Sequence, residues 1–205
     1  MAVLLIGGSS NVGKTTAARS VAAALGVDCV SLDDCVPPRV RASSPFHDDA
    51  IWDSDPGVLL DALRAHTAAL APTVRELVDR ERVRGDAVVE GEGIEPRLVT
   101  GWTHFDVRAV FVVETSVQRL RATLTARDSP GGRRYCELPE AAQHAIASMN
   151  CGYGQWIRAE AGGLAEAWVS SQPWSTLVAR ILAATNHCGD PKRRYHAEML
   201  DLHGD

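Results

Sequence analysis

The sequence predicts an α/β fold, in which a parallel sheet is covered by helices. Short apolar runs alternate with longer amphipathic segments along the chain, which is the pattern of such a sheet. The 205 residues are 45% hydrophobic, enough for the core of one domain. We expect this domain to span residues 1–186 and a polar tail to span residues 187–205.

Five short apolar runs predict the strands, because runs of this kind suit a sheet that is buried on both faces. The second run ends at Asp33 and Asp34, and the third ends at Glu90. The predicted strands span residues 3–6, 29–32, 86–90, 107–113 and 165–170.

Longer segments with one apolar face predict the helices. Gly26 stands where the first helix would be capped, and Gly85 where the second helical region would stop. Pro37 and Pro38 forbid simple helix continuation, so residues 35–56 are predicted to be irregular and to face the substrate. The predicted helices span residues 14–25, 58–84 with a bend at Pro72, 116–127, 138–157 and 174–184.

Composition limits the partners. A net charge of −5 argues against nucleic acid as the main partner, which usually needs a basic face. No apolar run is long enough to span a bilayer, so we expect no membrane association. We predict a cytoplasmic monomer or homodimer that binds a small molecule. The cysteines, without a CxxC pair, are expected to be reduced and to act as small buried hydrophobes: Cys29, Cys35, Cys136, Cys151 and Cys188.

Residues 8–15 match the phosphate-loop pattern GxxxxGK[ST], between a predicted strand and a predicted helix. Backbone amides of such a loop point at phosphate oxygens at the positive end of the helix. Lys14 would reach the β- and γ-phosphates, Thr15 would ligate Mg²⁺, and Thr16 would help with the α-phosphate. ATP with Mg²⁺ is therefore the expected cofactor, with GTP left open. The predicted nucleotide-binding residues are Gly8, Ser9, Ser10, Asn11, Val12, Gly13, Lys14, Thr15 and Thr16.

Acidic residues follow two predicted strands at the edge where open α/β sheets place their ligands. Asp33 or Asp34 could take a proton from an acceptor hydroxyl, although a turn or helix cap is the alternative. Alternation along a strand would send the two side chains to opposite sides, so the choice between them stays open. Glu90 is predicted to hold Mg²⁺ through water, and the alternative is a charged surface loop.

Arginines beside Gly131 and Gly132 predict a lid over residues 127–137. Arg127, Arg133 and Arg134 would stabilise the charge that develops during phosphoryl transfer, although single arginines are often only surface residues. An acceptor pocket is expected opposite the loop. The residues predicted to line it are Asp34, Arg39, His47, Trp52, Glu92 and Arg97.

Residues 3–16 resemble small P-loop kinases of the nucleoside-monophosphate-kinase-like superfamily. Residues 31–34 are similar to the acidic motif of uridine kinases and nicotinamide riboside kinases, in which the carboxylate matching Asp34 is taken as the base. Residues 88–96 resemble the strand-three exit of 2-phosphoglycerate kinase-like proteins. The resemblance implies a three-layer P-loop NTPase fold with helices on both faces of a five-stranded sheet of order 2-3-1-4-5, a lid, and adenine held by residues 168–173.

These features favour an ATP-dependent kinase. It would move the γ-phosphoryl group to a hydroxyl or phosphate of a small metabolite or an antibiotic-like molecule. The alternative is a nucleotide-hydrolysing switch or a regulatory NTP-binding protein that acts through a protein partner. The chain lacks the Asn-Lys-x-Asp motif of such switches, and its third predicted strand lacks their Asp-x-x-Gly motif. The acceptor stays open among a sugar, a glycerate, a nucleoside and an aminoglycoside.

Overall fold

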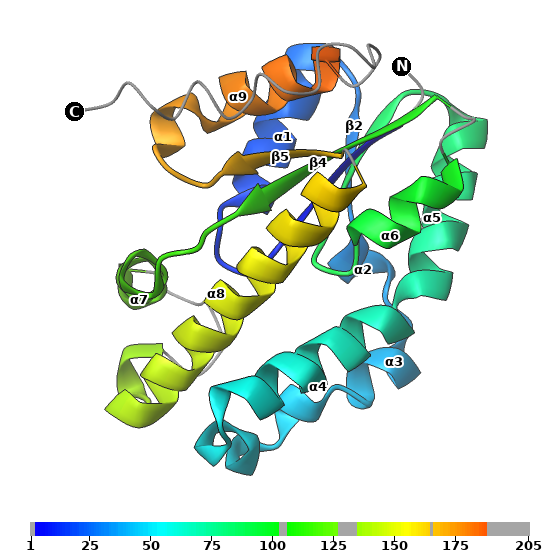
Figure 1. The fold of residues 1–205 in the computed structure, drawn as a ribbon. Coiled ribbons are helices and arrows are strands. Elements are labelled where there is room, and N and C mark those ends of the chain that lie inside the picture. The colour runs from blue at the N-terminus through cyan, green and yellow to red at the C-terminus, as the bar shows by residue number, and fades with distance from the viewer. Residues whose placement is uncertain (1–2, 103–105, 127–134, 165, 188–205) are drawn as a thin grey trace.

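A computed structural model describes residues 3–102, 106–126, 135–164 and 166–187 (Figure 1). The predicted lid arginines, Arg127, Arg133 and Arg134, lie outside these residues, as do Cys188 and most of the predicted tail. Within the described ranges, no helix has the length and apolar character needed to cross a membrane.

The sheet has five parallel strands in the order β2-β3-β1-β4-β5, which confirms the predicted fold class and strand order. In the central register, Ile6 of β1 and Ser31 of β2 are both paired with Glu90 of β3. Strands β2 and β3 therefore end at the same level, and β1 continues for two residues beyond it, to Gly8. The strands are β1 (Val3–Gly8), β2 (Asp28–Ser31), β3 (Ala87–Glu90), β4 (Val107–Val113) and β5 (Ala167–Ser170).

The predicted end of the second strand is wrong. Residues Leu32–Cys35 form a helical turn, α2, instead of extending β2. Leu32 is buried in the core while Asp33 and Asp34 are exposed in the first turn, where acidic side chains stabilise a helix start. The expectation that strand alternation separates these two carboxylates therefore fails.

The helical region predicted over 58–84 is two helices, α4 (Pro56–Ala69) and α5 (Ala71–Arg84). The break falls at Leu70, because Pro72 lacks an amide hydrogen and is accommodated in the first turn of α5. The segment 35–56 is more regular than expected, with one helix and two 3₁₀ turns. The other helices are α1 (Lys14–Leu25), α3 (Pro38–Ala42), α6 (Pro96–Val99), α7 (Val117–Ala126), α8 (Glu140–Gly163) and α9 (Trp174–His187), and the 3₁₀ turns span Pro45–His47, Asp49–Asp53, Thr100–Trp102 and Tyr135–Glu137.

Helices cover both faces of the sheet, giving three layers (Figure 1). One core lies under α4, α5 and α8, around buried residues such as Leu5, Phe111 and Tyr153. The other lies under α1, α7 and α9, around Ile6 and Val112. Neighbouring residues of the central strands thus enter opposite cores, which explains why their sequences are continuously apolar.

Among the described cysteines, the expectation of burial holds only in part. Cys151 is buried, Cys29 and Cys35 are partly buried, and all three are free thiols. Cys136 is exposed, so the prediction is wrong there. Burial raises the pKa of the Cys151 thiol, which keeps it protonated and unreactive near neutral pH.

Helix α8 packs directly on the end of β4 at a glycine. A Cβ atom added to Gly154 would lie 2.5 Å from the carbonyl oxygen of Glu114, which is too close for any side chain. The same helix contains Gly162, whose added Cβ would meet no atom within 4 Å. The two glycines therefore differ in their surroundings while sharing one helix.

We predict that Gly154→Ala lowers the free energy of unfolding by about 1–3 kcal/mol, the usual cost of overpacking a core. Gly162→Ala is the matched control, and it should stabilise the protein by up to about 1 kcal/mol because alanine is the better helix former. Urea denaturation of both variants measures the difference. Equal effects would contradict a close contact at Gly154.

Candidate phosphate-binding site

The loop from Gly8 to Thr15 joins β1 to α1 through backbone angles that suit glycine. Gly8 has a φ of 130°, and a Cβ there would overlap the carbonyl of Val112 on the neighbouring strand. Asn11 and Gly13 have φ angles of 64° and 84°. Residues in this conformation turn successive amides toward the inside of a loop, so the backbone can form an anion-binding nest.

The Lys14 side chain folds back over this loop. It is 8% exposed, and its ammonium donates a hydrogen bond to the carbonyl oxygen of Ser9 at 2.6 Å. The ammonium is thus fixed on the loop at the first turn of α1, where the helix dipole also favours an anion.

Glu90 links the loop to the neighbouring strands. Its carboxylate is 3% exposed and accepts a hydrogen bond from the Ser31 hydroxyl at 2.7 Å. The Thr15 hydroxyl lies 3.2 Å from both Glu90 oxygens. A hydroxyl and a carboxylate are hard oxygen donors, and Mg²⁺ is usually bound by one or two such groups together with phosphates and water. The residues present therefore fit Mg²⁺.

Residues after β3 also touch the loop. The Glu92 carboxylate accepts a hydrogen bond from the Ser10 amide at 2.9 Å, across 82 positions of sequence. Three residues further on, the Glu95 carboxylate accepts hydrogen bonds from the Thr67 hydroxyl at 2.6 Å and the Tyr153 hydroxyl at 3.1 Å. Helices α4 and α8 thus hold this segment against the phosphate loop.

Two buried polar atoms have no hydrogen-bond partner within the described part of the chain, the Ser9 hydroxyl and the Asn150 side-chain oxygen. Ser9 is the second residue of the loop and is fully buried, and Asn150 on α8 is 2% exposed. Asn150 was not predicted as a site residue. The available signal was a polar residue one turn before Tyr153 on the buried stripe of a helix.

Glu114 is a second missed residue, directly after β4. It is 3% exposed and accepts hydrogen bonds from the amides of Thr115 and Ser116 at 2.9 Å, at the start of α7. It also accepts from Ser171 at 2.8 Å and Arg119 at 3.1 Å. The Glu114 carboxylate thus links α7 to Ser171 after β5. Ser171 belongs to residues 168–173, which the resemblance implies as the adenine site.

The predicted acceptor residues are distributed over several elements. On α2 and α3, Asp33, Asp34 and Arg39 are exposed. His47 is also exposed, and its ring contacts the carbonyl of Arg41. Beyond α3, Trp52 packs on the core and its ring stacks on Phe46 at 5.3 Å.

Arg97 is engaged with α8. Its guanidinium forms a bidentate ion pair with Glu160, in which one of the two hydrogen bonds is 2.8 Å long. The Arg97 side chain is nevertheless 71% exposed. The same hydrogen bonds lower the pKa of Glu160 and raise that of Arg97. Of the predicted acceptor residues, Glu92 is the one that hydrogen-bonds the phosphate loop in the described residues.

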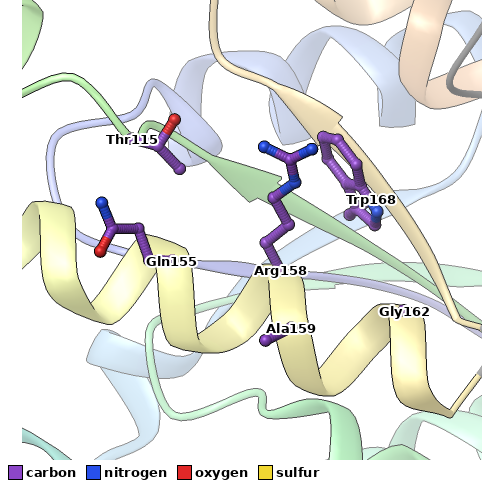
Figure 2. Close-up of a pocket in the computed structure, with 6 residues that line it drawn as sticks. All are labelled: Thr115, Gln155, Arg158, Ala159, Gly162 and Trp168. Atoms are coloured by element: carbon purple, nitrogen blue, oxygen red, sulfur yellow. The ribbon is translucent and has the colours of Figure 1, made fainter.

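A separate hollow of about 420 Å³ lies beside α8, lined by Thr115, Gln155, Arg158 and Trp168 among others (Figure 2). The Arg158 guanidinium lies over the Trp168 ring, 4.4 Å from the ring centroid. Gln155, Arg158 and Gly162 form one stripe of the helix, and Tyr153 and Ile157 form the buried stripe. The hollow therefore belongs to a different side of α8 from Tyr153.

No protein-family model matches the chain, and no curated protein matches its sequence. Solved structures share the fold. Deoxyadenosine kinase from M. mycoides with bound dATP has a TM-score of 0.52 at 10% identity, covering 91% of this chain and 100% of that chain. Shikimate kinase from Acinetobacter baumannii in complex with shikimate has a TM-score of 0.52 at 14% identity, covering 92% and 96%.

A sugar kinase from Janibacter sp. is similar to the same degree, with a TM-score of 0.50 at 14% identity, covering 90% of this chain and 94% of that chain. At these identities the likeness shows a common fold. The chain has the fold of small P-loop kinases, as the resemblance implied, and the likeness to uridine kinases in particular stays a prediction.

Tyr153 gives a prediction on pH. Burial, and next the charges of Glu95 and Glu92, raise the pKa of Tyr153 well above its ordinary value. The folded state therefore holds this proton more tightly than the unfolded state, so the associated stability is complete below about pH 10 and is lost as the pH rises further. We expect Tyr153→Phe to cost about 1 kcal/mol at pH 7, by loss of buried hydrogen bonds.

Above pH 10 the difference in stability between the wild type and the Tyr153→Phe variant should shrink, because the variant has no phenol at this position to ionise. Thermal denaturation at pH 7, 9 and 10.5 measures it. A difference that grows with pH would contradict the raised pKa.

Proposed function

We propose that the protein is an ATP-dependent kinase that transfers the γ-phosphoryl group to a hydroxyl of a small molecule. The observation that carries the proposal is the loop itself, with its left-handed residues, the ammonium of Lys14 on the Ser9 carbonyl, and the Thr15–Glu90 contact. The fold shared with a sugar kinase, a shikimate kinase and a deoxyadenosine kinase supports a small acceptor.

The donor half of the reaction uses the loop. Its amides and Lys14 bind the β- and γ-phosphates and draw negative charge away from the bond that breaks. Thr15 and Glu90 would hold Mg²⁺, which when bound neutralises charge on the phosphates. Lid arginines 127, 133 and 134 are proposed to complete the neutralisation and to exclude water.

The acceptor half uses a carboxylate of α2. Asp34 is the proposed base and Asp33 the alternative, both one turn beyond Ser31, which itself donates to Glu90. The base takes the proton of the acceptor hydroxyl, the acceptor oxygen bonds to the γ-phosphorus, and the bond from that phosphorus to the bridging oxygen breaks. ADP leaves with the electron pair of this bond, and the phosphate monoester is the second product.

The test is a screen of hydroxyl compounds with ATP and Mg²⁺ that measures both ADP release and the phosphorylated acceptor. Sugars, glycerate, shikimate, nucleosides and aminoglycosides form the panel. Lys14→Ala should reduce transfer by about 10³-fold or more, because it removes the positive charge that binds the transferred phosphoryl group. It should leave the fold intact. Arg19→Ala, an exposed change on the same helix, is the matched control and should keep wild-type activity.

Hydrolysis of GTP that responds to a protein partner, with no phosphorylated acceptor, would overturn the kinase proposal. Equal activity of the Lys14→Ala and Arg19→Ala variants would overturn the assigned role of the loop lysine.

A second prediction separates the two carboxylates of α2. Asp34→Asn should lower kcat by about 10²–10⁴-fold, the usual contribution of a general base, and should leave ATP binding unchanged. Asp33→Asn is its matched pair and should keep most of the activity. Steady-state kinetics and calorimetric titration with ATP give the two readouts. If Asp33→Asn lowered kcat and Asp34→Asn did not, the base would be Asp33. If both variants kept their activity, neither residue would be the base.

A further inference from the structure

We propose that Glu92 is a positioning residue of the donor side of the site, which acts through one peptide group of the phosphate loop on the ammonium of Lys14. This inference rests on the role proposed for Lys14 in the kinase reaction. It gives Glu92 a function different from the acceptor contact that the sequence predicts. Its starting point is a pair of hydrogen bonds that meet at the peptide between Ser9 and Ser10.

This peptide group is bound on both sides by charged side chains. Its carbonyl oxygen, from Ser9, accepts a hydrogen bond from Lys14 Nζ at 2.6 Å, and its amide, from Ser10, donates to Glu92 Oε1 at 2.9 Å. The peptide is trans, so its carbonyl and its amide point in opposite directions. The ammonium and the carboxylate therefore lie on opposite sides of the loop backbone, and a continuous chain of hydrogen bonds joins them.

The order of charges along this chain strengthens each of its hydrogen bonds. A carboxylate on the amide hydrogen polarises the peptide and makes the carbonyl oxygen a better acceptor for the ammonium. A reversed peptide would turn its carbonyl oxygen toward Glu92 and its amide hydrogen toward Lys14, so charges of the same sign would meet at both contacts. Glu92 thus favours the one orientation of the peptide that holds Lys14.

The backbone around Glu92 is itself held in place, so its carboxylate is directed at the loop. A Cβ atom added to Gly91 or to Gly93 would lie 2.5 Å or 2.9 Å, respectively, from a side chain of the core. The amide of Gly91 donates to the carbonyl of Ile6 at 3.2 Å, and the carbonyl of Glu92 accepts from the Tyr153 hydroxyl at 3.2 Å. The segment after β3 is therefore a fixed support for the phosphate loop.

The carboxylate has a second effect, because its negative charge also repels a bound phosphate. This repulsion falls with distance, and the Ser9–Ser10 peptide separates the carboxylate from the side of the loop on which the ammonium lies. The hydrogen bond and the charge of Glu92 therefore act in opposite directions on nucleotide binding. Variants that separate the two effects are needed to test the proposal.

Three substitutions make this separation. Glu92→Gln keeps an oxygen that can accept from the Ser10 amide and removes the charge. Glu92→Asp keeps the charge, but its side chain is one methylene shorter and does not reach the amide from a fixed backbone. Glu92→Ala removes both, and if it does not fold, Glu92→Asp takes its place. Glu76→Ala, at an exposed position of α5, is the matched control.

The first experiment measures how firmly Lys14 is held, without any nucleotide. The chain has two lysines, Lys14 and Lys192, so acetic anhydride labelling read by mass spectrometry gives the rate at Lys14 relative to an internal standard. We expect labelling of Lys14 to be about tenfold faster in Glu92→Ala and Glu92→Asp than in the wild type, which is the scale of one hydrogen bond to a charged group. Glu92→Gln should stay within about threefold of the wild type, because it keeps the neutral form of that hydrogen bond.

Equal rates in all the proteins would overturn the proposal. A Glu92→Gln variant labelled as fast as Glu92→Ala would also overturn it, because the charge and not the contact with the peptide would then be what holds Lys14.

The second experiment is a double-mutant cycle on the binding of ATP with Mg²⁺, measured by calorimetric titration. Glu92→Ala should bind ATP about tenfold more weakly than Glu92→Gln when Lys14 is present, and at most about twofold more weakly in the Lys14→Ala background, where no ammonium remains to be positioned. Glu76→Ala should bind ATP as the wild type does. An equal difference in both backgrounds would show that Glu92 does not act through Lys14.

The two proposals fail in different ways. A complete absence of phosphoryl transfer in the screen of acceptors would overturn the kinase proposal, whereas the labelling rates of Lys14 do not depend on transfer. Unchanged labelling in an active kinase would overturn the role of Glu92 alone.

Discussion

The buried carboxylate of Glu90 is the interaction on which the candidate site depends. A charge at 3% exposure is costly unless hydrogen bonds compensate for it, and here the donors come from two other segments, Thr15 of the loop and Ser31 of β2. The parallel register makes this possible, since Glu90 is paired with both Ile6 and Ser31. The ends of β2 and β3 are therefore linked at Glu90 to the end of the phosphate loop, and α2 and the segment after β3 both start next to this residue.

The part of the fold that sequence predicts is the part governed by local rules. The GxxxxGK[ST] pattern carries its own geometry, and apolar runs mark strands that are buried on both faces. Predictions fail where a long-range contact decides. The apolar run predicts Leu32 as the last residue of a strand, yet Leu32 is the first residue of α2 and its side chain is buried in the core. The helix break at Leu70, by contrast, follows a local rule, because the proline two residues later is accommodated in the first turn of the next helix.

The residues of the candidate site divide in the same way, into those that a local motif predicts and those that a long-range contact brings to the site. Lys14, Thr15 and Glu90 were predicted because a motif or a strand end identifies them, and they do lie together. Asn150 and Glu114 have no motif, and their importance appears only when α8 packs against the sheet and four donors converge on one carboxylate. Glu92 was predicted as an acceptor residue, but its hydrogen bond to the Ser10 amide joins residues 82 positions apart and could not be read from the sequence.

The position of Lys14 has a further consequence. A lysine side chain loses roughly 1.5–2 kcal/mol of conformational entropy when it is fixed in one arrangement. Here the protein meets that loss during its own folding, because its own backbone, at the Ser9 carbonyl, holds the ammonium. A phosphate group would meet an immobilised cation that exchanges one oxygen partner for another. Recognition at this loop is thus a replacement of partners within a rigid frame, and little of the binding energy is lost to ordering the side chain.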